Sequence, residues 1–110
     1  MIFHKELAAG RWNELGLLEQ MANIGSEVER ALNWKAKSNP ERAAKAFDRA
    51  LELFDLTLDC PNNRSRLKEV ARTREIWVDF FWGENQFDSS AEFFRKYFLQ
   101  FACAARKVKG

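Results

Sequence analysis

Arg74 is the residue whose type and position in this sequence most invite a chemical role. Between Leu67 and Trp82, a helical periodicity of about 100° per residue gathers apolar side chains on one face, and Arg74 falls near the middle of that face. Because a guanidinium keeps its charge inside proteins, Arg74 must meet carboxylates, backbone carbonyls or a bound anion. The apolar members of the face are Leu67, Val70, Ala71, Trp77, Val78 and Phe81.

Two acidic residues are candidate partners of Arg74. Glu27 and Asp55 lie at the edges of the inner faces of two other expected helices, within reach of a long guanidinium. Arg74 either joins a structural ion pair with its stem buried, or lines a groove that binds the phosphate or carboxylate of a small anionic ligand or nucleotide. We predict the buried pair, in which Arg74→Ala should cost about 3 to 5 kcal/mol of stability.

Other catalytic and metal-binding patterns are weak. The single histidine, His4, lies close to the N-terminus, and the sequence holds no Glu-x-x-His and no Cys-x-x-Cys motif. Cys60 and Cys103 have no metal-ligand spacing, and the glycines are scattered singly. We therefore expect no catalytic residue, no metal and no cofactor, and we favour a binding protein over an enzyme.

Four amphipathic helices are expected to position these residues. Short connections between them leave antiparallel neighbours, which predicts one all-α domain with the topology of an antiparallel up-down-up-down four-helix bundle. On the inner face of the first helix, Gly25 is explained by the close approach of a neighbour or, equally well, as a tolerated small residue. The predicted elements are an N-terminal arm over residues 1–11 and helices over about 12–37, 40–60, 64–82 and 89–107.

Turn and capping residues mark the boundaries between these helices. Asn39 can cap the second helix, and either Asn62 or Asn63 can cap the third. Ser89 and Glu92 have the spacing of a capping box, which predicts that Ser89 caps the fourth helix.

The apolar content points to a partner. Of 110 residues, ten are Phe, four Trp and one Tyr, a heavy aromatic load for so short a chain. Leu53 and Leu56 point away from the apolar stripe of their helix, while Phe80 and Trp82 lie at the edges of theirs. We predict that these four residues form the interface of a homodimer or a contact with another protein.

Charge and hydropathy bear on whether the protein binds nucleic acids or associates with a membrane. The net charge is only +2, although residues 61–110 hold ten basic and six acidic residues, so RNA or DNA binding stays an alternative. No apolar run approaches the roughly 20 residues of a membrane span, and we expect a cytoplasmic protein with no membrane association. The basic side chains that could form a nucleic-acid surface are Arg64, Arg66, Lys68, Arg72, Arg95 and Lys96.

The segments LLEQMANIGSEVERAL and RLKEVARTREIWVDFF, in a chain of this length and hydrophobic pattern, resemble small prokaryotic bundles of the HEPN and nucleotidyltransferase-substrate-binding kind. The resemblance implies a dimer that partners a small nucleotidyltransferase. Ribonucleases of that group carry an arginine followed by a histidine, but no histidine follows Arg72 or Arg74 here. The resemblance therefore favours a non-enzymatic, homodimeric interaction module.

Overall fold

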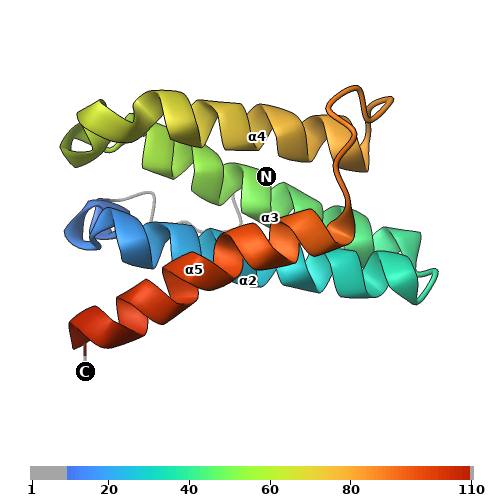
Figure 1. Ribbon diagram of the computed structural model, residues 1–110, viewed down its shortest axis with the longest axis horizontal. Helices are drawn as coiled ribbons and strands as arrows, with labels where there is room; N and C mark the ends of the chain where they lie inside the picture. Colours follow the sequence, from blue (N-terminus) through green and yellow to red (C-terminus); the bar gives the residue numbers. More distant parts are fainter. Residues whose placement is uncertain (1–9, 110) are drawn as a thin grey trace.

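The computed structural model describes residues 10–109, and within them the chain forms helices and no strand (Figure 1). The predicted all-α class is confirmed for this part of the chain. Most of the predicted N-terminal arm, residues 1–9 with His4, lies outside the described residues. The long helices are α2 (Leu17–Ala36), α3 (Pro40–Asp59), α4 (Leu67–Phe81) and α5 (Ala91–Lys109), and the short 3₁₀ segments are η1 (Arg11–Glu14) and η2 (Pro61–Arg66).

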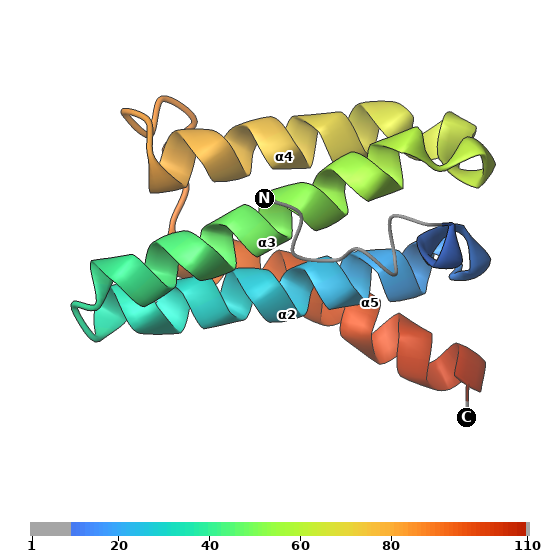
Figure 2. The same ribbon diagram turned by 180° about the vertical axis from the view of Figure 1, so that it is seen from behind.

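The helices pack as a bundle around the pair α2 and α3, which lie side by side. α5 crosses α2 on one side of this pair, and α4 runs along α3 on the other (Figures 1 and 2). The most extensive contacts join α2 to α3 and α2 to α5, whereas α4 packs mainly on α3. The central pair therefore holds the two outer helices in place.

Aromatic rings connect the outer helices to the core. Trp77 of α4 is fully buried, with its ring centroid 5.6 Å from that of Phe47 on α3 and 5.1 Å from that of Phe94 on α5. Ring pairs of this kind add about 0.5–1.5 kcal/mol each beyond the burial of their area. The Trp77 Nε1 is buried without a hydrogen-bond partner among the described residues, and the rings of Phe47 and Phe94 pack against the side chain.

The first and third predicted helices begin later than the sequence suggested. The first is interrupted at Leu15, which is extended, and at Gly16, which is the N-cap of α2. The third begins at Leu67, because Pro61–Arg66 wind as the 3₁₀ segment η2. Asn39 caps α3 as expected, since its side chain accepts the N–H of Arg42 at 3.1 Å.

The predicted capping box of the fourth helix is wrong by one residue. α5 begins at Ala91, and the Ser90 hydroxyl accepts the N–H of Phe93 at 3.1 Å. Ser89 stays in the loop because the Asn85 side chain holds it on both sides: its Oδ1 accepts the Ser89 N–H at 2.8 Å, and its amide donates to the Ser89 carbonyl at 3.0 Å. The N–H and carbonyl groups of Ser89 therefore bond to the Asn85 side chain, and they are not available for capping the helix.

A buried polar cluster, which we define as Trp12, Gln20, Thr57 and Asn63, ties η1, α2, α3 and η2 together. The Trp12 Nε1 donates to the Thr57 hydroxyl at 3.0 Å. The Gln20 amide donates to the Trp12 carbonyl at 3.0 Å, and its oxygen accepts from the Asn63 amide at 2.7 Å. Asn63 was a predicted helix cap, but its side chain is buried here instead, because Gln20 and the Thr57 carbonyl offer it acceptors.

Candidate functional site

Arg74 lies at the edge of the buried face of α4, not at its centre. The buried residues of α4 are Val70, Thr73 and Trp77, and Ala71 is exposed, so the core face is turned from the predicted stripe toward Thr73. The Arg74 Nε donates to the Asp55 Oδ1 at 2.9 Å, with 35% of the Arg74 side chain and 57% of the Asp55 side chain exposed. The predicted ion pair exists, but the prediction that it is buried is wrong.

Glu27, the other predicted partner of Arg74, pairs with a different arginine. Its carboxylate accepts from Arg30 on the same helix, Oε1 to Nη1, at 3.1 Å. Its other oxygen is buried without a hydrogen-bond partner among the described residues. The structure thus pairs Arg74 with Asp55 and gives Glu27 a different partner.

A pocket of 540 Å³, which we call the Arg74 pocket, lies between α3, α4 and the loop before α5. Asp79 shapes it, since its carboxylate accepts the backbone N–H groups of Gln86 at 2.9 Å and Phe87 at 3.1 Å. The one arginine is outnumbered by three acids, and this balance disfavours an anionic ligand. The lining residues are Asp55, Leu58, Ala71, Arg74, Glu75, Val78, Asp79, Gln86 and Phe87.

Only one of the four predicted interface residues is prominently exposed. Leu53 is 3% exposed and belongs to the core, so the expectation that it needs a partner to cover it is wrong. Leu56 and Phe80 are half-buried against the same core. Trp82, at the end of α4, is 60% exposed and remains available to a partner.

Several members of the predicted basic surface are neutralised by acids. Arg66 pairs with Glu69, Arg95 with Glu29 and Lys96 with Glu92. Ion pairing of this kind leaves less positive potential to attract a phosphate backbone.

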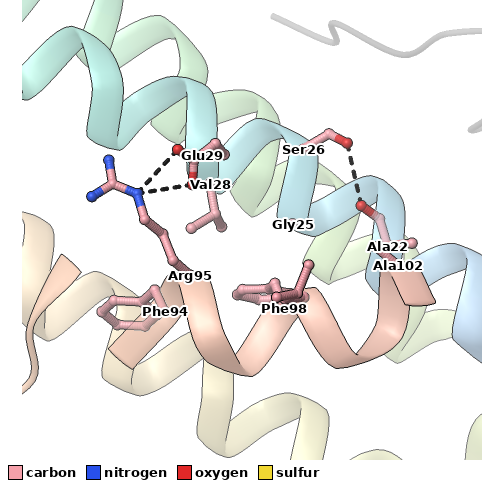
Figure 3. A pocket seen from close by; sticks show the side chains of 10 residues that line it. Ala22, Gly25, Ser26, Val28, Glu29, Phe94, Arg95, Phe98 and Ala102 are labelled. Atoms are coloured by element: carbon pink, nitrogen blue, oxygen red, sulfur yellow. Dashed lines mark hydrogen bonds and ion pairs between the residues drawn. The ribbon is translucent and has the colours of Figure 1, made fainter. Parts of the chain in front are cut away.

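The sequence did not lead us to an open groove of 490 Å³ between α2 and α5, which we call the α2–α5 groove (Figure 3). At one end, the Arg95 Nε donates to both carboxylate oxygens of Glu29 at 3.0 Å, and its Nη2 donates to the Asn33 side chain at 3.1 Å. This bridge holds α5 to α2. The lining residues are Ala22, Gly25, Ser26, Val28, Glu29, Phe94, Arg95, Phe98, Leu99 and Ala102.

The walls of the α2–α5 groove come together closely at Gly25. A Cβ atom added to Gly25 would lie 2.8 Å from the Cβ of Phe98, closer than side chains normally pack, so the close approach suggested by the sequence is present. Phe98 points toward Gly25 in Figure 3, while the Ser26 hydroxyl is turned to the Ala22 carbonyl. The central walls of the groove therefore present mainly apolar surface.

Leu99 is the most exposed large apolar side chain that borders this groove, at 61%. A second hollow of 270 Å³ shares Ala22, Ser26 and Ala102 with the groove and continues along the two helices to Arg106. The exposed position of Leu99 could have been found from the sequence, because it lies off the Phe94, Phe98 and Phe101 stripe of its helix.

Several kinds of site find no support in the part of the chain that the structure describes. No group of three or more His, Cys, Asp and Glu side chains there could hold a metal ion. No described helix is both long and apolar enough to cross a membrane. Comparison with known proteins matches the chain to no family model, no curated protein and no solved structure.

Proposed function

We propose that this protein is a non-enzymatic interaction module that forms a homodimer in the cytoplasm, built as an antiparallel up-down-up-down four-helix bundle. Exposed large apolar side chains support the proposal, since Trp82, Phe87, Phe93 and Leu99 are each at least 40% exposed. Covering a side chain of this size contributes about 1.5–3 kcal/mol when it goes from fully exposed to fully buried. A partner surface is the simplest use for so much exposed apolar area.

The observation that carries the proposal is Leu99 at the rim of the α2–α5 groove. Leu99 is an exposed leucine beside a groove of 490 Å³ whose central walls are mainly apolar. A protruding apolar side chain next to an apolar groove is typical of the buried core of protein interfaces. The Arg74 pocket is the weaker candidate, because its three acids and its existing ion pair oppose the anion that Arg74 would otherwise attract.

A second protein partner is part of the proposal. The resemblance of the two quoted helical segments to nucleotidyltransferase-associated bundles supports a nucleotidyltransferase-like protein in this role. Trp82, which is 60% exposed and directly follows the last residue of α4, offers this partner a contact away from α2 and α5.

Sedimentation velocity of the full chain at several micromolar concentrations tests the dimer. We expect the mass of two copies of the 12.9 kDa chain at the higher concentrations, with dissociation on dilution. A single species with the mass of one chain at every concentration would overturn the proposal.

A further inference from the structure

We infer that the α2–α5 groove is the contact of the homodimer, occupied by a second copy of this chain, with the two α5 helices antiparallel and Leu99 at the two-fold axis. The inference rests on the proposed function and names the surface that the dimer would use.

The outward face of α5 carries the residues that define this arrangement. Residues three and four apart on a helix share one face, and such a series, which we call the α5 stripe, runs through Leu99. Leu99 is its large apolar member and lies seven residues from both Glu92 and Arg106. The stripe consists of Glu92, Arg95, Lys96, Leu99, Ala102, Cys103 and Arg106, and all but the partly buried Ala102 are exposed.

This equal spacing makes the stripe complementary to itself. In a two-fold dimer the same patch faces itself, and two antiparallel helices that cross at Leu99 bring Glu92 of each copy opposite Arg106 of the other. The two contacts join opposite charges and flank a central leucine pair. A parallel pairing would instead set Glu92 against Glu92 and Arg106 against Arg106, which like-charge repulsion disfavours.

The groove offers room for the second α5. Small residues in its walls, Ala22 and Ala102, let another helix approach closely, whereas Gly25 is already covered by Phe98. The Arg95 bridge to Glu29 and Asn33 lies at one end, and the hollow that reaches Arg106 extends the surface at the other. The apolar middle and charged ends match the layout of a small interface, with a water-excluded centre and a polar rim.

A pair of substitutions on α5 tests the surface. Leu99→Asp should raise the dimer dissociation constant by at least about tenfold, because it sets two carboxylates at the axis. Gln100→Asp is the matched control, since it adds the same charge one residue away, off the stripe, and should leave the constant within about twofold. Circular dichroism checks that both variants keep their helices.

Charge reversal tests the antiparallel register independently of Leu99. Glu92→Arg and Arg106→Glu should each weaken the dimer, and the double variant should bring the dissociation constant back toward that of the unchanged chain. Single variants that weaken the dimer without recovery in the double variant would overturn the register.

A cysteine at position 99 supplies a covalent readout that does not depend on affinity. In a Cys103→Ser background, Leu99→Cys should form a disulfide-linked dimer on mild oxidation, because residues at a two-fold axis come within bonding reach. Gln100→Cys in the same background should stay largely monomeric on a non-reducing gel, and buried Cys60 should not contribute.

The outcomes separate the two proposals. If the unchanged chain sediments as one copy, the homodimer itself fails. If it sediments as two copies while Leu99→Asp leaves the dimer intact and Leu99→Cys gives no crosslink, the dimer stands and the α2–α5 groove is excluded as its contact.

Discussion

At the scale of single residues, the ion pair of Arg74 is partly exposed to solvent, which the helical pattern did not predict. Its pairing with Asp55 joins α4 to α3 across a partly exposed surface, where water and salt weaken the attraction. We therefore expect Arg74→Ala to cost only about 0–1 kcal/mol, and the double-mutant cycle with Asp55→Ala to give a coupling in the same range. Urea unfolding measures both, and a loss of about 3–5 kcal/mol would show that the pair behaves as a buried one.

Tyr97 makes a pH-dependent contribution to the stability of the folded protein. Partial burial of its hydroxyl is the main cause that raises its pKa above 10.0, and the hydrogen bond with Thr73, 3.2 Å away, offsets part of that increase. Because the folded state holds this proton more tightly, the contribution is complete below the unfolded pKa and is lost as the pH rises through the folded pKa.

The comparison of Tyr97 with phenylalanine isolates this effect. Tyr97→Phe should lower the free energy of unfolding at neutral pH by about 0.5–1.5 kcal/mol through the lost hydrogen bond. As the pH rises above about 10, however, the variant should lose less stability than the unchanged chain, since phenylalanine has no proton to release. Equal losses in the two proteins would show that Tyr97 titrates alike in the folded and unfolded states.

At the scale of the elements, the crossing of α2 and α5 depends on Gly25. Gly25→Ala gains about 1 kcal/mol in helix propensity, but its Cβ would meet Phe98 at 2.8 Å, and overpacking of this kind costs about 1–3 kcal/mol. We expect a net loss of stability in urea unfolding. Ser26→Ala is the control on the exposed neighbouring position and should change stability by less than about 0.5 kcal/mol.

The helices themselves could be predicted from the sequence, because apolar side chains recur at three and four residues in every one of them. Their exact faces could not. Arg74 appeared central because Ala71 and Val78 were counted as core, but α4 turns Thr73 inward, where its hydroxyl finds the Glu69 carbonyl at 2.8 Å. A threonine whose hydroxyl donates to the carbonyl four residues earlier in its helix can occupy a buried position in place of an apolar residue. The periodicity of apolar residues does not reveal such a position.

The candidate sites were harder to predict than the helices, since they depend on contacts between elements. Leu53 lies off the stripe of its helix, yet the assembled bundle buries it. The α2–α5 groove arises where Phe98 meets Gly25, and nothing in either local sequence says that these two residues meet. The start of α5 was missed for a similar reason, because Asn85 holds Ser89 back from the helix.

At the scale of the whole molecule, the buried polar cluster joins segments that are far apart in the chain. Gln20→Ala removes an amide that is 0% exposed, so the Trp12 carbonyl and the Asn63 amide each lose one hydrogen bond but keep the Leu15 N–H and the Thr57 carbonyl as partners. Each buried hydrogen bond that is lost contributes about 0.5–1.5 kcal/mol, so we expect a total loss of about 1–3 kcal/mol in thermal and urea unfolding.

The matched control for Gln20 lies one turn along the same helix. Asn23 is exposed, and its amide donates to the Glu19 carbonyl at 2.8 Å on the surface of the helix, so Asn23→Ala should change stability by less than about 0.5 kcal/mol. If both alanine variants unfolded at the same denaturant concentration as the unchanged chain, the polar cluster would not contribute to the stability of the bundle.

The contact between Gly25 and Phe98 also limits how the sequence can diverge. The atom that a larger residue would meet is the Cβ of Phe98, which every amino acid except glycine possesses. A compensating change at position 98 therefore gives little relief, and only a shift of the whole of α5 makes room. Homologous chains should keep glycine at position 25 while the residue at 98 drifts among large apolar types, and a lineage that loses the glycine should also have replaced many residues of α5.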